Sequence, residues 1–390
     1  RSLKDLFPSQ WEQMKAPEFW VDPLNDTKYP FKKDAPKTIQ SRLLRGKPRV
    51  KEIPFNPTSR LHIAHNLIQK YGWNEFTTEG RPKVDESILS KLEYPEAEVL
   101  VRYLTIMKRL GQLADGKEAW MRLEKEGYIH GNVNPCGAVT GRCTHRRPNI
   151  AQVPRVGALW GKECRELFTV PEGWSLVGVD MKGLELRCLA HYTYPFDEGR
   201  YVKEILEGDI HTANMKAAGL KDRGPAKNFI YAFLYGAGDA KIGSLVGGGR
   251  AEGSQLRAKF LRRMPAIKYL QDGIKIALKS RRNLIAVDGR PLRIRSSHSA
   301  LNTLLQSAGA IAMKHATCIL HKKIQAQGWE KQALQVAHIH DEIQLQVRTE
   351  IAEDVGRLAI QSMCEAGEEL RFRCPLDGDY KIGRNWAETH

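Results

Sequence analysis

The feature that most constrains the fold is the segment HIHDEIQLQV at residues 338–347. Apolar and polar residues alternate in its second half, and this period of two predicts a half-buried β-strand. The residues at 335–339 can form the partner strand of a hairpin. The bend carries His340, Asp341 and Glu342, whereas tight hairpin turns favour Gly, Asn or Asp-Gly. Two explanations stay open: a solvated turn, or a site that needs adjacent carboxylates.

A second acid follows an apolar run far upstream. The run WSLVGVD at 174–180 predicts a buried strand that ends in Asp180, with Glu185 five residues later. If Asp180 and Asp341 meet, they could hold Mg²⁺, which prefers one or two protein carboxylates, water and phosphate oxygens. Two such ions clamp the attacking and leaving oxygens in phosphoryl transfer. The alternative is two unrelated exposed acids.

The segment DRGPAKNFIYAFLYGAG at 222–238 predicts a helix that carries two cations and two aromatic rings on one stripe. Positions four apart drift by only about 40° around a helix. Cations can bind a polyphosphate, and a ring one turn further on can stack on a base or sugar. A solvated cationic edge with packed tyrosines is the simpler alternative. The stripe residues are Arg223, Lys227, Tyr231 and Tyr235.

Two further segments carry donors for nucleic acid. Residues 137–154 (GAVTGRCTHRRPNIAQVP) include Arg142 and Gln152, which suit phosphates and minor-groove acceptors. A basic surface loop is the alternative. On a predicted helix, Asn302 and Gln306 lie four residues apart; they form either an internal hydrogen-bonded pair or a second minor-groove probe.

Charge favours a polyanionic partner. The chain of 390 residues holds 61 Lys and Arg against 45 Asp and Glu, a net charge of +16, which is typical of binding to nucleic acid or an acidic membrane surface. A soluble basic protein without such a partner is the alternative. The odd number of cysteines, seven, predicts reduced thiols in a cytoplasmic protein. No signal peptide or bilayer-spanning run is apparent, so we expect no membrane association.

Many helices and few strands predict the α+β class. Helices are expected near 97–113, 301–325 and 350–367. Residues 21–54 are basic and rich in proline, so we expect a loop or small extension without regular structure.

Several motifs, in order, resemble those of family A DNA polymerases. VGVDMKGLELRCLAH, RGPAKNFIYAFLYGAG and AHIHDEIQLQV resemble the three polymerase motifs. GAVTGRCTHRRPNIAQVP, LNTLLQSAGA and DGDYKIGRNWAETH are similar to the replicative branch of short-tailed phages. The resemblance runs from about Phe55 to the C-terminus. It implies a right-hand fold with an antiparallel palm sheet. The implied parts are a thumb at 1–116 with its insertion at about 21–54, a palm at 117–192 and 302–390, and helical fingers at 193–301.

The resemblance implies a DNA-directed DNA polymerase that adds dNTPs to a primer 3′ end and releases pyrophosphate. Asp180 and Asp341 would ligate two Mg²⁺ ions with the backbone carbonyl of Met181, and Mn²⁺ could substitute. Glu342 would support this site, and Lys227 would act in catalysis.

The resemblance also implies the substrate contacts. Arg223, Lys227 and His211 would grip the triphosphate. Tyr231 would stack at the incoming nucleotide and favour dideoxynucleotides, and Glu185 would exclude a ribose 2′-OH. The residues implied to contact primer and template are Arg142, Gln152, Tyr235, Asn302, Gln306 and His340.

The sequence departs from the family pattern in two places. Lys182 stands where the family often has Ser, and a cation there could depress the pKa of Asp180 or compete with metal. The acidic D-x-E cluster of a proofreading exonuclease is absent from the first 55 residues, so we expect no proofreading by this chain.

The partners implied are primer–template DNA, dNTPs and a phage helicase–primase. The short insertion argues against strong binding of a thioredoxin-like processivity factor. We expect a monomer in the cytoplasm of a bacterial host. A single-subunit RNA polymerase and a non-catalytic DNA-binding relic are the rival interpretations.

Overall fold

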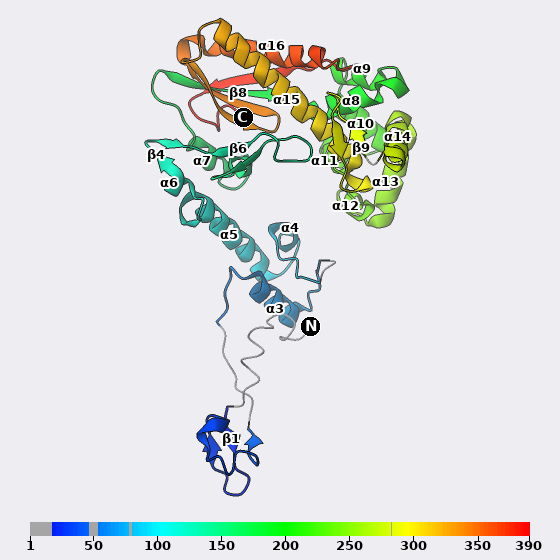
Figure 1. Ribbon diagram of the computed structural model, residues 1–390. Coiled ribbons are helices and arrows are strands. Elements are labelled where there is room, and N and C mark those ends of the chain that lie inside the picture. Colours follow the sequence, from blue (N-terminus) through cyan, green and yellow to red (C-terminus); the bar gives the residue numbers. More distant parts are fainter. Residues whose placement is uncertain (1–17, 47–53, 78–79, 282) are drawn as a thin grey trace. The chain divides into compact units, whose positions relative to one another are not determined.

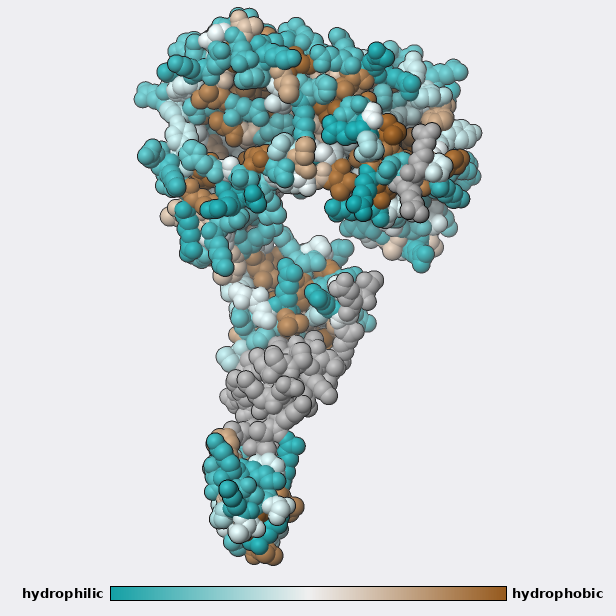
Figure 2. Space-filling model, in the orientation of Figure 1, coloured by the Kyte–Doolittle hydropathy of each residue, from teal (hydrophilic) through white to brown (hydrophobic). Residues whose placement is uncertain are grey.

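The computed structural model describes residues 18–46, 54–77, 80–281 and 283–390. These residues divide into two compact units, one reaching Tyr128 and the other spanning Ile129–His390. Helices dominate both units (Figure 1). Figure 2 shows polar residues over most of the visible surface of each unit, with apolar residues in separate groups. Within the described ranges, no helix is both long and apolar enough to cross a membrane.

The helices of the first unit enclose a small apolar core. Ile63, Leu67, Trp73 and Leu89 are buried in it. The helix expected near 97–113 is confirmed: it ends at Leu110 and continues as one π-helical turn. The elements are α3 (Arg60–Tyr71), α4 (Glu86–Leu89), α5 (Pro95–Leu110), α6 (Trp120–Leu123), β4 (Glu124–Lys125) and β5 (Tyr128–Ile129).

The prediction that residues 21–54 lack regular structure was wrong for the part that the structure describes. Three short antiparallel strands, in the order β2-β1-β3, form a sheet here. Asp22 is fully buried and pairs with Arg42 at 2.6 Å. A partner twenty residues away leaves no periodic trace in the sequence, so pattern analysis missed this sheet. The strands are β1 (Trp20–Val21), β2 (Lys28–Tyr29) and β3 (Leu44–Arg45); residues 47–53 of the predicted insertion lie outside the described ranges.

The second unit is built on a four-stranded antiparallel sheet, as predicted for the palm. Its strand order is β11-β12-β8-β13. Helix α16 packs against β8 and β13, and α15 packs against α16 (Figure 1). The α+β class is therefore confirmed. These elements are β8 (Trp174–Met181), β11 (Ala333–Ile339), β12 (Glu342–Arg348), β13 (Gly378–Gly383), α15 (Ala300–Ala326) and α16 (Ala352–Glu369).

Apart from α7 (Gly161–Glu166), the remaining helices of this unit share one apolar core with the sheet. Phe260 packs edge-on against Phe229 and Phe233, with ring centroids 5.2 Å apart in each pair. The other elements are β6 (Asn132–Asn134), β7 (Thr144–Arg146), α7 (Gly161–Glu166), α8 (Leu184–Asp197), α9 (Arg200–Leu206), α10 (Ile210–Ala218), α11 (Arg223–Leu234), α12 (Asp239–Ser244), α13 (Arg250–Arg263), α14 (Pro265–Arg281), β9 (Asn283–Ile285) and β10 (Pro291–Arg293).

The hairpin strand β12 forms where it was expected, but the prediction that it is half-buried was wrong. Its polar face is covered as well, since Gln344 is 2% exposed and Gln346 is 7% exposed. The segment after β13 lies over this face, where Thr389 Oγ1 donates to Gln344 Oε1 at 2.9 Å. Alternation therefore marked a strand whose polar face is buried, with the Gln344 side chain hydrogen-bonded inside the protein.

Candidate active site

Strand register brings acids from distant parts of the chain together. Asp180 is the penultimate residue of β8 and lies directly opposite Glu342 on β12 and Asp379 on β13. Directly opposite residues of antiparallel strands project from the same face. The backbone N–H of Met181 donates to the carbonyl of Asp341 at 3.0 Å, which ties the hairpin bend to the end of β8. The two acids that the sequence singled out therefore belong to one site.

The electrostatics of this site fit a divalent cation. Desolvation by the surrounding protein, followed by the charges of Asp341 and Glu342, raises the pKa of Asp180 to about 7. Partial burial and the nearby Glu185 raise the pKa of Asp341. The Asp180 side chain is nonetheless exposed to solvent, so water screens part of this repulsion. A hard cation would relieve the rest.

Oxygen donors are the ligands that Mg²⁺ prefers. Within the described ranges, no group of three or more His, Cys, Asp or Glu side chains is arranged to hold a metal ion unaided. Mg²⁺ often binds through one or two protein carboxylates together with water and substrate phosphates.

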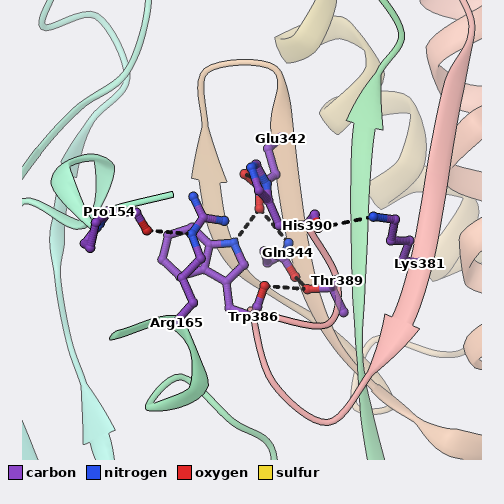
Figure 3. A network of polar contacts seen from close by, with 8 residues as sticks. All are labelled: Pro154, Arg165, Glu342, Gln344, Lys381, Trp386, Thr389 and His390. Carbon is purple, nitrogen blue, oxygen red and sulfur yellow. Dashed lines mark hydrogen bonds and ion pairs between the residues drawn. The ribbon is translucent and has the colours of Figure 1, made fainter. Parts of the chain in front are cut away.

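Glu342 is held on both of its oxygens (Figure 3). Its Oε1 accepts hydrogen bonds from Trp386 Nε1 at 2.5 Å and Gln344 Nε2 at 2.6 Å. Its Oε2 lies 3.1 Å from His390 Nδ1. Burial alone would raise the pKa of Glu342, but these contacts, led by His390, outweigh burial and lower it. Glu342 is therefore a fixed anion beside Asp180, with little freedom to turn toward a ligand.

The sequence interpretation missed Trp386 and His390 as parts of this site. Both lie in the closing segment DGDYKIGRNWAETH, which the resemblance included without assigning roles to its residues. A tryptophan among polar residues was the available signal, because a buried indole N–H needs an acceptor.

Glu185 lies in a second group of contacts. Its Oε1 accepts a hydrogen bond from Tyr235 at 3.1 Å and lies 3.3 Å from Arg142 Nη2. Burial and the Glu185 charge raise the pKa of Tyr235 to about 12. Tyr235 and Arg142 thus both contact Glu185. The resemblance placed Glu185 at the ribose gate, Tyr235 at the templating position and Arg142 at the primer minor groove.

The stripe predicted on α11 is confirmed as a surface. Arg223 and Lys227 are exposed, and the Tyr231 and Tyr235 rings stack with centroids 6.4 Å apart. Arg223 pairs with Asp209 at 3.2 Å, at the start of α10. The residues predicted to face the core are all buried: Phe229, Ile230, Phe233 and Leu234.

His211 lies close to the stripe. Burial first, and then the charges of Lys227 and Arg223, lower the pKa of its imidazole. The structure therefore gathers the three residues expected to bind the triphosphate.

The remaining predicted DNA contacts come from several elements. Asn302 and Gln306 are half-buried on α15, and Gln152 ends the 3-10 helix Ile150–Gln152. His340 occupies the bend at φ 59°, and burial and Arg142 lower its pKa. Lys314 of α15 donates to the carbonyls of Pro135 and Gly141, which anchors the loop that carries Arg142.

Lys182 turns its ammonium group toward β13. Its Nζ lies 2.7 Å from Asp379 and 3.3 Å from Asp377. It therefore compensates the acid that lies across the sheet from Asp180. This pairing supplies a structural reason for the cation at a position where the sequence raised the question of interference.

The comparisons with known proteins agree with this geometry. The sequence model of DNA polymerase family A matches residues 35–388. The chain is 45% identical to the DNA-directed DNA polymerase of Enterobacteria phage T3, over 87% of this chain and 53% of that protein. It is 44% identical to the corresponding polymerase of Escherichia phage T7, with the same coverage. The chain thus spans about half the length of these relatives.

A solved structure has the same fold. The POL domain of Pol1 from M. smegmatis, in complex with DNA primer–template and dNTP, matches with a TM-score of 0.75 at 20% identity. The match covers 87% of this chain and 62% of that one.

Proposed function

The chain belongs to DNA polymerase family A, and from this premise we propose that it extends a DNA primer along a template, consuming dNTPs and releasing pyrophosphate. The observation that carries the proposal is the junction of Asp180 with the hairpin bend at Asp341, held by strand register and the Met181–Asp341 bond. Crowded carboxylates at the end of a rigid sheet, beside a cationic helix stripe, suit phosphoryl transfer.

Asp180, Asp341 and the Met181 carbonyl would hold Mg²⁺, with Mn²⁺ as a substitute. When bound, the ions neutralise charge on the phosphates and favour an ionised primer 3′-oxygen. Glu342, which is itself fixed, maintains the negative field that attracts them.

The stripe of α11 would bind the incoming nucleotide. Arg223, Lys227 and His211 present cationic and N–H groups to the triphosphate, where charge develops during phosphoryl transfer. The Tyr231 ring offers a stacking surface. No covalent step on the protein is needed, since position and charge stabilisation account for the catalysis.

Glu185 would select deoxynucleotides. Its contacts with Tyr235 and Arg142 fix the carboxylate beside the nucleotide position. A fixed acid there opposes a ribose 2′-OH by its bulk. This arrangement favours a DNA polymerase over a single-subunit RNA polymerase.

Primer extension tests the proposal. A primed template is incubated with Mg²⁺ and dNTPs, rNTPs, or dNTPs with added ddNTPs. We expect extension with dNTPs and strong termination by ddNTPs, and little extension with rNTPs. The matched control is Asp341→Asn, which should bind the primed DNA without extending it. Absence of extension by the wild-type chain under all conditions, with DNA binding intact, would refute the catalytic proposal in favour of a DNA-binding relic.

Two finer proposals accompany this function. A labelled primer with a mismatched 3′ end should not be shortened when dNTPs are omitted, because we propose no proofreading by this chain. The similarity to phage polymerases further supports action in the cytoplasm of an infected bacterium, which localisation of a tagged chain in such cells would test.

A further inference from the structure

Arg165 is a buried cation that forms no ion pair with a carboxylate among the described residues, although the more distant charge of Glu342 partly offsets the effect of burial on its pKa. It lies on α7 and is 6% exposed. Its guanidinium lies over the ring of Trp386, 4.3 Å from the ring centroid, and its Nε donates to the carbonyl of Pro154 at 3.0 Å (Figure 3). Its Nη1 has no hydrogen-bond partner in the part of the chain that the structure describes.

Fold stability does not explain a guanidinium at this position. A buried N–H without an acceptor costs about 1–3 kcal/mol. Even buried ion pairs can often be replaced by apolar side chains of similar volume at no cost to stability. A methionine could occupy this space without leaving an N–H group unpaired. The charge of Arg165 therefore needs a different explanation.

The Trp386 ring connects Arg165 with the acidic site. The cation lies over the face of the indole, whereas the Nε1–H at the ring edge donates to Glu342 Oε1 at 2.5 Å. A cation over the face makes the indole N–H a stronger donor, and an anion at the edge makes the face more attractive to a cation. The two interactions therefore reinforce each other.

The same guanidinium holds a second part of the site. Pro154, which accepts the Nε hydrogen bond, ends the segment 137–154 that carries Arg142 and Gln152. Arg165 thus lies between the backbone of a predicted primer-binding segment and the carboxylate opposite Asp180. Loss of its planar, charged group would release the Trp386 ring that holds this carboxylate.

From this geometry we infer that Arg165 is a positioning residue for polymerisation, which acts through Trp386 to fix the orientation of Glu342. This inference rests on the proposed function, because its readout is nucleotide incorporation. It assigns Arg165 no contact with substrate. The effect should therefore appear in kcat rather than in the KM for dNTP or in DNA affinity.

The test compares two Arg–Trp stacks in the same protein. Arg165→Met removes the charge, and Arg165→Lys keeps the charge but removes the planar guanidinium group. The matched control is Arg348→Met, since Arg348 lies over Trp174 at 4.5 Å. That pair occupies the end of β12 and β8 away from the acids.

We expect Arg165→Met to lower kcat about tenfold or more, because small misplacements of reacting groups have large effects on rate. Arg165→Lys should show a smaller loss in kcat. The KM for dNTP and the DNA dissociation constant should stay within about twofold of wild type, as should every parameter of the control.

Two further variants test whether Arg165 acts through Trp386 and Glu342. Trp386→Phe keeps an aromatic ring under Arg165 but removes the N–H donor, and it should reproduce the loss in kcat. In a Glu342→Gln background, Arg165→Met should cause little additional loss, because residues that act through one contact are not additive.

The inference would be overturned by any of three results. These are Arg165 variants with the kcat of the Arg348→Met control, a silent Trp386→Phe variant, or full additivity with Glu342→Gln. If Arg165→Met fails to bind DNA through misfolding, Arg165→Lys and Trp386→Phe decide the question. An inactive wild-type chain would refute the proposed function instead, so the two failures are distinguishable.

Discussion

Replacing Asp180 with Asn should stabilise the metal-free protein at alkaline pH. The carboxyl group has a pKa of 3.8 in an unfolded chain and about 7 in the folded protein. The folded state therefore binds more protons between these values, and its stability falls as the pH rises from about 4 through 7. The Asn amide has nearly the same shape as the carboxyl group and does not ionise, so the stability of the Asp180→Asn variant does not fall in this way.

The magnitude follows from the difference between the two pKa values. The full difference corresponds to about 4 kcal/mol of folding free energy, because one pKa unit is equivalent to about 1.36 kcal/mol. Because the Asp180 side chain is exposed, solvent screening reduces the expected gain to about 1–2 kcal/mol. For a unit of this size that gain raises the melting temperature by about 2–6 °C.

Calorimetry in EDTA at pH 5 and pH 8 measures the effect. We expect the Asp180→Asn variant to melt above the wild type at pH 8, and the difference to shrink at pH 5. Mg²⁺ should raise the melting temperature of the wild type and have little effect on the variant, because the ligand set that we propose is complete only in the folded wild type. Asp379→Asn is the matched control, since Asp379 shares the sheet face but is paired with Lys182. A pH-independent difference, or equal stabilisation of both proteins by Mg²⁺, would refute the reasoning.

Three other substitutions have defined outcomes. Glu185→Ala removes the acid bonded to Tyr235, and rNTP incorporation relative to dNTP incorporation should rise about tenfold or more in single-nucleotide kinetics. Tyr231→Phe removes a hydroxyl that can replace the missing 3′-OH, so the preference for dNTP over ddNTP should increase about a hundredfold in competition assays; an unchanged ratio would contradict the role of Tyr231. Lys182→Ser leaves the charges of Asp379 and Asp377 uncompensated. The site becomes more negative, so the half-saturating Mg²⁺ concentration should fall by up to about fivefold. An increase would mean that the Lys182 ammonium assists metal binding directly.

Local pattern predicted much of the fold. The α11 stripe emerged from a spacing of four because helix geometry alone decides which residues share a face. The hairpin was predicted from a period of two, whereas the acids in its bend alone left a solvated turn and a functional site open. By contrast, the sheet at residues 20–45 includes a pair between the buried Asp22 and the half-exposed Arg42, which no periodicity records.

Periodicity and turn chemistry act over a few neighbouring residues, so local sequence predicted the long helices, the hairpin and the residue types that they present. The tertiary structure was needed to bring Asp180 opposite Glu342, which is 162 positions later in the chain. The same holds for the hydrogen bond from Trp386 to Glu342 and for the place of Arg165 over that ring. Such contacts depend on strand register and on the path of the closing segment, which are set by burial summed over the whole unit. Local sequence names the groups that can react, and their mutual orientation follows from packing between distant segments.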